Sequence, residues 1–215
     1  MRNKYEAFIQ LLNFNRDKYL AEKVFKDFIS LFAISLSNKV AYNQENSELY
    51  ERIYKSYDKS EQFNFYALSA ELVKLFCNED NPYDILGEIY QEVTNKCYLK
   101  LLNNNPLQEV GKKLQGVVNI NKKHNNGKMI EMNCGSGAMI LAYASTLKMF
   151  KMNYKFDLEV TAIDTDIINV FMTYIQLYFF EISAVVILVD EKTNKELMRL
   201  YTPLYEDEEE NLMVA

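Results

Sequence analysis

The sequence of 215 residues contains no tryptophan, only three prolines and only six glycines. Asparagine, lysine, tyrosine, phenylalanine and isoleucine are abundant instead, a skew that is typical of an AT-rich genome and carries no chemistry. Hydrophobic residues make up 49% of the chain, so it can bury a sizeable core, and intrinsic disorder is excluded. A chain of this length forms one domain with a large appendage, or two small domains.

Cysteine and histidine are also scarce. The three cysteines, Cys77, Cys97 and Cys134, lack metal-type spacing, and their odd number argues against a disulfide framework and suits a reducing compartment. The single histidine, His124, lies in a polar segment that predicts an exposed loop. A histidine-based catalytic triad or a metal site therefore finds little support in this sequence.

Long apolar runs are missing as well. The longest, residues 182–189, is far too short to cross a bilayer. The first residues, MRNKYEAF, lack the hydrophobic core of a secretory signal. We therefore expect a soluble, cytoplasmic protein without a membrane partner.

The chain lacks the basic excess that is usual for a protein that binds DNA alone, because its net charge is −6. Five of the negative charges form one run, residues 206–210, and without them the net charge would be −1. Such a run is typical of a solvated tail. It could also be an acidic segment that docks on a basic partner.

The first 115 residues are predicted to be helical, because apolar residues recur there at three- and four-residue spacing. The predicted helices cover residues 5–12, 18–36, 47–57, 60–77 and 83–93, with a polar loop at 40–47. Asp17 is a candidate cap for the second helix. Pro82 is expected at an early position of the last helix, where its missing N–H costs nothing.

From residue 128 onwards, strands and helices are expected to alternate. The pattern predicts strands at 128–133, 157–163 and 184–189, and helices at 138–152 and 166–180. Right-handed crossovers between such strands give a mostly parallel sheet. The expected fold is α/β, with a small or incomplete Rossmann-like sheet over residues 116–205, a helical N-terminal region over 1–115 and an acidic tail over 206–215.

The segment Glu131-Met132-Asn133-Cys134-Gly135-Ser136-Gly137 carries the strongest functional signal. It lies where the first predicted strand ends and a helix begins. Glycines at such a turn let the backbone bend sharply and approach a ligand closely, and the helix N-terminus adds free N–H groups. Glu131, at the strand end, could hold an amine or a hydroxyl of a cofactor. A purely structural strand–helix turn explains the same glycines, and Cys134 is expected to be a small packing residue.

Three acidic residues follow the next two strands. Asp164 ends the second strand, where dinucleotide-type folds bind ribose hydroxyls. Asp166 could instead simply cap the next helix. Asp190, after the third strand, could face the adenine of a cofactor or begin a turn over residues 190–194.

The segment EMNCGSGAMIL resembles the glycine-rich S-adenosylmethionine (SAM) motif of N6-adenine DNA methyltransferases, the modification-subunit type of restriction systems. The downstream segment from Ala162 to Ile187 and the sequence YTPLY are similar to short methylase-like proteins of phages and plasmids. The helix DILGEIYQEV resembles the one that precedes the SAM domain in that family. The resemblance covers residues 83–205 and implies a SAM-type sheet. It implies methionine-side and backbone contacts to SAM from Glu131, Asn133, Gly135 and Gly137, a ribose contact from Asp164, and a position near the adenine for Asp190.

Two departures from the family limit this implication. The family's aromatic-rich Phe-Thr-Pro element has a single candidate here, Asn103-Asn104-Asn105-Pro106, which lacks the aromatic. The catalytic Asn-Pro-Pro-aromatic tetrapeptide, which holds a flipped adenine, is absent. Its nearest echo, Asn81-Pro82-Tyr83, precedes the glycine motif and is better explained as a helix start, unless the chain is circularly permuted.

Two hypotheses from different classes follow. In the first, the protein is a SAM-binding, N6-adenine-methyltransferase-like protein of a mobile element that is catalytically degenerate alone, with DNA or a partner subunit completing its function. In the second, the same fold serves as an interaction protein that inhibits a host nuclease, as anti-restriction and anti-CRISPR proteins do. A domain that binds NAD or another nucleotide is a third possibility.

Overall fold

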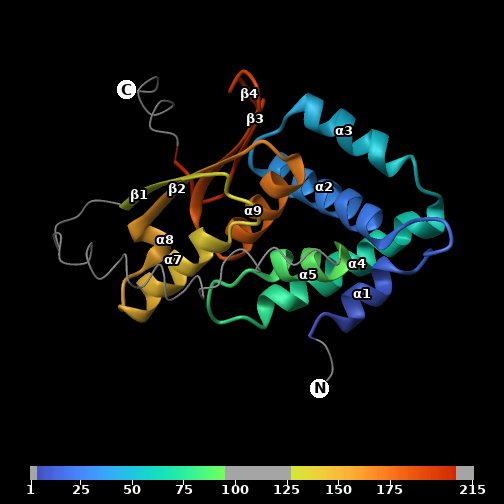
Figure 1. Cartoon of the computed structure of the whole chain (residues 1–215), viewed down its shortest axis with the longest axis horizontal. Coiled ribbons are helices and arrows are strands. Elements are labelled where there is room, and N and C mark those ends of the chain that lie inside the picture. Colours follow the sequence, from blue (N-terminus) through green and yellow to red (C-terminus); the bar gives the residue numbers. More distant parts are fainter. Residues whose placement is uncertain (1–3, 95–126, 207–215) are drawn as a thin grey trace.

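The computed structural model describes residues 4–94 and 127–206 of the chain (Figure 1). The first range forms α1 (Glu6–Leu12), α2 (Ala21–Val40), α3 (Gln44–Tyr54), α4 (Lys59–Cys77) and α5 (Ile85–Thr94). The second range forms β1 (Gly127–Met132), α7 (Ala138–Met149), α8 (Tyr154–Asp157), β2 (Leu158–Asp164), α9 (Ile167–Phe179), β3 (Ser183–Val189) and β4 (Glu196–Tyr201). The predicted α/β fold with a helical N-terminal region is confirmed.

The four strands form one small sheet in the order β1-β2-β3-β4. The pairs β1–β2 and β2–β3 are parallel, as predicted, and β4 adds an antiparallel strand beside β3. The short helix α8 and the strand β4 were not expected from the sequence. The β4 segment, ELMRLY, has three exposed residues out of six and no long apolar run, so its pairing with the buried β3 determines its conformation.

The helix boundaries differ from the sequence prediction at several places, and α7 ends at Met149 instead of residue 152. The loop predicted at 40–47 shrinks to three residues, because α2 continues to Val40 and the Asn43 side chain accepts a hydrogen bond from the Asn46 amide to cap α3. Asp17 does not cap α2, whose N-cap position is Leu20. Pro82 lies before α5 and outside it.

The helix α9 lies between the sheet and the N-terminal helices (Figure 1), packing against α2 and α5 on one side and β2 and β3 on the other. Nine of its thirteen residues are buried, as expected for a helix that is apolar on all sides. Phe179 stacks on Phe76 of α4 and Phe32 of α2, with ring centroids 4.6 and 6.0 Å away. One continuous hydrophobic core therefore joins the helical region to the sheet.

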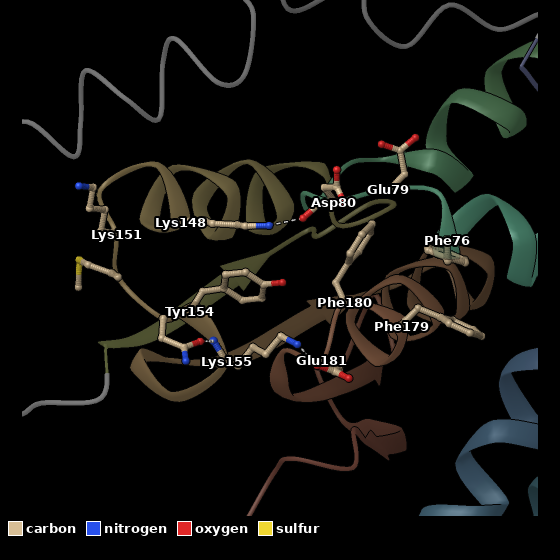
Figure 2. Close-up of a pocket in the computed structure, with 12 residues that line it drawn as sticks. Phe76, Glu79, Asp80, Lys148, Lys151, Tyr154, Lys155, Phe179, Phe180 and Glu181 are labelled. Carbon is tan, nitrogen blue, oxygen red and sulfur yellow. Dashed lines mark hydrogen bonds and ion pairs between the residues drawn. The ribbon is translucent and has the colours of Figure 1, made fainter.

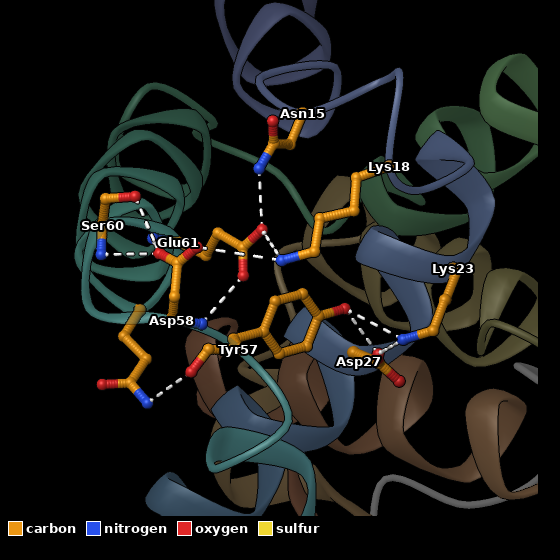
Figure 3. A network of polar contacts seen from close by, with 9 residues as sticks. Asn15, Lys18, Lys23, Asp27, Tyr57, Asp58, Ser60 and Glu61 are labelled. Atoms are coloured by element: carbon orange, nitrogen blue, oxygen red, sulfur yellow. Dashed lines mark hydrogen bonds and ion pairs between the residues drawn. The ribbon is translucent and has the colours of Figure 1, made fainter.

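A polar network around the buried Glu61 links the segment between α1 and α2 to the start of α4 (Figure 3). The Glu61 side chain, 4% exposed, accepts hydrogen bonds from Asn15 and Lys18, each at 2.7 Å, and from the Asp58 amide at 2.8 Å. Asp58 in turn accepts from the Glu61 amide and so completes a capping box at the start of α4. Burial raises the pKa of Glu61, but the bonds from Lys18, Asp58 and Asn15 outweigh it and leave that pKa lowered.

Membrane spanning finds no support among the helices of residues 4–94 and 127–206, none of which combines sufficient length with sufficient apolar character. The same residues contain no group of three or more histidine, cysteine, aspartate or glutamate side chains that could hold a metal ion. Several predictions lie outside the described residues. These are His124, Cys97, the Asn103–Pro106 element, the boundary at residue 115, and residues 207–215 of the acidic tail.

Candidate cofactor site

The glycine segment forms the tight turn that the sequence predicts between β1 and α7. Asn133, Gly135 and Gly137 adopt positive φ angles of 60°, 58° and 91°. The Gly137 amide donates to the Cys134 carbonyl at 2.8 Å, and the Cys134 amide donates to the Ile163 carbonyl of β2 at 3.0 Å. Three left-handed residues within five positions reverse the chain sharply and then deliver it into the first turn of α7.

The two glycines of the turn are required for different reasons. A Cβ atom on Gly137 would lie 3.2 Å from the Thr173 hydroxyl oxygen, so this glycine allows the turn to pack closely on α9. A Cβ atom on Gly135 would meet nothing within 4 Å. Packing therefore explains Gly137, whereas Gly135 leaves an open space on the outside of the turn.

Asp164, at the end of β2, holds the turn through a hydrogen bond to the Gly135 amide. Its carboxylate accepts hydrogen bonds from the Gly135 amide at 2.9 Å, the Asp166 amide at 2.9 Å and the Asn169 side chain at 3.3 Å. The residue is only 6% exposed. Its observed contacts are thus with the protein itself, on the inner side of the glycine turn.

A second carboxylate, Asp84, holds the turn from the helical region. Asp84 Oδ2 accepts a hydrogen bond from the Ser136 hydroxyl at 2.7 Å. Its Oδ1 accepts from the Gly87 amide at 2.9 Å, which caps α5, and from Gln176 Nε2 at 2.8 Å. The same Gln176 nitrogen donates to the Ser136 carbonyl at 2.7 Å, and Gln176 Oε1 accepts from the Leu86 amide at 3.1 Å. These bonds join α5, the turn and α9.

A cavity of about 240 Å³ opens between the turn and α5 at the carboxyl end of β1. Three of the six predicted ligand residues, Glu131, Asn133 and Gly135, line it. The other three predicted residues, Gly137, Asp164 and Asp190, are not part of its lining. The remaining lining residues are Asp84, Gly87, Tyr90, Gln91, Cys134, Ser136, Ala138, Met139, Asn169 and Met172.

The two open interpretations of the later aspartates are clarified by their contacts. Asp166 occupies the N-cap position of α9, where its side chain accepts from the Ile168 amide at 2.8 Å. Asp190 Oδ1 accepts from the amides of Lys192 and Thr193 and from the Thr193 hydroxyl. Asp166 is therefore a helix cap, and Asp190 begins the turn between β3 and β4.

Cys134 is buried in the turn. It is 7% exposed, and burial raises the pKa of its thiol to about 12, against a smaller lowering effect of the hydrogen bond from Thr173. The thiol stays protonated at neutral pH, and only a thiolate is an effective nucleophile. The prediction that Cys134 is a packing residue agrees with this environment.

A larger cavity, of about 450 Å³, lies at the opposite end of the sheet, where α7 and α9 end (Figure 2). The Lys148 ammonium donates to the Asp80 carbonyl, and Lys155 pairs with Glu181. Aromatic rings of Tyr154, Phe179 and Phe180 complete its walls (Figure 2). Because open α/β sheets bind ligands at the carboxyl ends of their strands, the smaller cavity beside the glycine turn is the better candidate site.

The sequence prediction missed the residues that α5 and α9 contribute to the site. Asp84 was mentioned only as part of a helix that resembles one in the family. The feature that could have identified it is its helix-capping position, three residues before Gly87. Thr173 and Gln176 are fully buried polar residues on an otherwise apolar helix, three positions apart. Buried polar groups need partners, so this spacing was a signal that α9 contacts a polar feature. The Asn81-Pro82-Tyr83 segment does not line the cavity.

The sequence matches no protein-family model and no curated protein. Among solved structures, the chain is similar to a candidate class I S-adenosylmethionine-dependent methyltransferase from Listeria monocytogenes, with 10% sequence identity and a TM-score of 0.41. The similarity covers 93% of this chain and 66% of that protein, so the chain spans slightly less than two thirds of its length.

Proposed function

We propose that the protein is methyltransferase-like and binds S-adenosylmethionine in the cavity beside the glycine turn. The observation that carries this proposal is the convergence of Glu131, Asn133 and Gly135 on one cavity at the carboxyl end of β1. The resemblance of the turn to the SAM motif of N6-adenine DNA methyltransferases, seen in the sequence alone, supports the same ligand.

The residues of the turn fit such a ligand in two respects. The open space at Gly135 is one that any other side chain would partly fill, so the backbone can approach a bound molecule closely. Glu131 places a carboxylate in the lining of the cavity, suited to a positively charged amine. In this proposal Glu131, Asn133 and the backbone at Gly135 hold the methionine part of SAM.

Asp164 and Gly137 have indirect roles in the proposal. Asp164 orients the Gly135 amide from below, and Gly137 allows the turn to pack on Thr173. We propose no ligand contact for Asp190, whose carboxylate is engaged in the turn that follows β3. The proposed binding site therefore includes fewer of the residues that were predicted from the sequence, namely Glu131, Asn133 and Gly135.

We further propose that this chain alone does not transfer a methyl group to adenine in DNA. Bound SAM would supply an electrophilic methyl group, but the tetrapeptide that holds a flipped adenine in the family is absent from the sequence. A partner subunit would have to hold the base. The net charge of −6 also favours a partner that contributes the DNA-binding surface.

Isothermal titration of the purified chain with SAM, S-adenosylhomocysteine and NAD tests the ligand proposal. We expect saturable heat with the two adenosyl compounds and none with NAD. The Gly135→Ala variant adds a methyl group in the open space and should weaken binding by about tenfold or more, equivalent to about 1.4 kcal/mol. No heat and no thermal shift of the wild type with any of the three would reject SAM binding and favour the interaction protein.

A further inference from the structure

The wall of the cavity that faces the glycine turn comes from α5, which belongs to the N-terminal helical region. Asp84, Gly87, Tyr90 and Gln91 all line the cavity. Residues spaced by three and four positions share one face of a helix, so a single face of α5 is presented to the turn. The helical region thus contributes directly to the site.

Asp84 is the point at which this wall meets the turn. Its two carboxylate oxygens accept three hydrogen bonds, from Ser136, Gln176 and the Gly87 amide. One of these bonds begins α5, one reaches the turn, and one reaches the fully buried Gln176 of α9. Displacing the carboxylate would therefore disturb all three elements together.

Gly87 makes this position of the carboxylate possible. A Cβ atom on Gly87 would lie 2.1 Å from Asp84 Oδ2 and 2.6 Å from Asp84 Cγ, well inside contact distance. Only a residue without a side chain at position 87 leaves room for the Asp84 carboxylate, which folds back over the first turn of α5. The sequence Asp84-Ile85-Leu86-Gly87 encodes both halves of this arrangement.

We infer that Asp84 is a positioning residue: through Ser136 it holds the glycine turn in its ligand-binding conformation and couples ligand binding to the docking of α5. The inference rests on the proposed function for the identity of the ligand, although the positioning itself does not require it. A ligand that contacts both the glycine turn and α5 stabilises the contact between them. By thermodynamic linkage, loss of that contact lowers the affinity for the ligand.

Hydrogen–deuterium exchange of the full chain, with and without S-adenosylhomocysteine, tests the inference. Ser136→Ala removes one hydroxyl, and Asp84→Ala removes the carboxylate. Both should speed exchange of the amides at 135–137 by about tenfold or more, since local opening limits exchange at such amides. Asp84→Asn should restore slow exchange, because the amide oxygen can cap α5 and the Ser136 hydroxyl can accept from the amide nitrogen.

The matched control is Ser69→Ala. Ser69 donates to the Phe65 carbonyl within α4, so its hydroxyl is also half-buried and hydrogen-bonded but lies outside the cavity lining. This variant should leave exchange at 135–137 unchanged. Ligand added to the wild type should slow exchange at residues 87–91 of α5, and the affinity of Ser136→Ala for S-adenosylhomocysteine should fall by about tenfold, equivalent to about 1.4 kcal/mol.

The two proposals fail in distinguishable ways. Unchanged exchange at 135–137 in a folded Ser136→Ala protein would overturn the positioning role, whatever the ligand does. If the wild type binds no adenosyl compound but Ser136→Ala loosens the turn, the positioning role stands and the ligand proposal falls. Should Asp84→Ala fail to fold, the Ser136→Ala and Asp84→Asn variants decide the outcome.

Discussion

The carboxylate of Asp164 accepts a hydrogen bond from the amide of Gly135, with Oδ2 and N 2.9 Å apart. The two residues are 29 positions apart in the chain, on the end of β2 and on the turn that follows β1. Adjacent parallel strands bring their carboxyl ends together, which makes this contact possible. The acid thus supports the conformation of the turn.

Replacing Asp164 with asparagine should destabilise the fold by about 1–3 kcal/mol, because the new amide nitrogen must then face a backbone N–H, of Gly135 or of Asp166, from which a carboxylate oxygen accepts a hydrogen bond in the wild type. Asp166→Asn is the matched control two residues later. Asparagine caps helices as well as aspartate does, so this change should cost only a few tenths of a kcal/mol. Urea unfolding of both variants gives the comparison. Equal stabilities would mean that the Asp164 hydrogen bonds contribute nothing.

The glycines of the turn should differ in their tolerance of alanine. Both have positive φ, so each change costs about 1 kcal/mol for the left-handed backbone. Gly137→Ala also brings a methyl group within 3.2 Å of Thr173. This overpacking should lower the free energy of unfolding by a further amount of about 1–3 kcal/mol. In thermal unfolding, the Gly135→Ala variant should therefore have a clearly higher melting temperature than the Gly137→Ala variant. The reverse order would contradict the packing of the turn at Gly137 against Thr173 of α9.

Cys134 should resist alkylation at neutral pH. Its pKa of about 12 leaves almost no thiolate, and the side chain is buried. Cys77 is exposed and serves as the control within the same chain. With iodoacetamide at pH 7.5 and peptide mass spectrometry, Cys134 should react at least about tenfold more slowly than Cys77. Comparable rates in the folded protein would show that the turn opens readily.

Glu61 should make stability depend on acid pH. Because its pKa is lowered in the folded state, its contribution is complete above the ordinary value of 4.5 and is lost as pH falls through the folded-state pKa. Glu61→Gln should therefore reduce the unfolding free energy by about 1–3 kcal/mol at pH 7 and by progressively less below pH 4.5. A difference between wild type and variant that grows as pH falls would reverse this sign.

The control for this pH series is Glu51→Gln. Glu51 pairs with Lys55 one helical turn away on the surface of α3, and its side chain is 55% exposed. Exposed pairs of this kind contribute about 0–1 kcal/mol, so the variant should follow the wild type closely at every pH. Urea unfolding between pH 3 and pH 7 distinguishes the contribution of the buried Glu61 from that of the exposed pair.

Local features of this protein were determined by the sequence itself. The glycine turn, the strand segments and the cap at Asp166 all depend on residues within a few positions of each other. Backbone conformation and capping are short-range effects, so periodicity and residue type predict them. The identity of the cavity-lining residues Glu131, Asn133 and Gly135 followed from the same short segment.

Only the tertiary structure decided what the acidic side chains contact. Asp164 and Asp190 follow strands as the ligand residues of such folds do, yet their observed partners are amides of the protein itself. Asp84 meets Ser136 across 52 positions and Gln176 across 92. Such contacts depend on how α5, α9 and the turn pack together, and β4 likewise depends on the edge of β3. Packing over long sequence separations is not encoded in local pattern, which is why these partners emerged only in the folded chain.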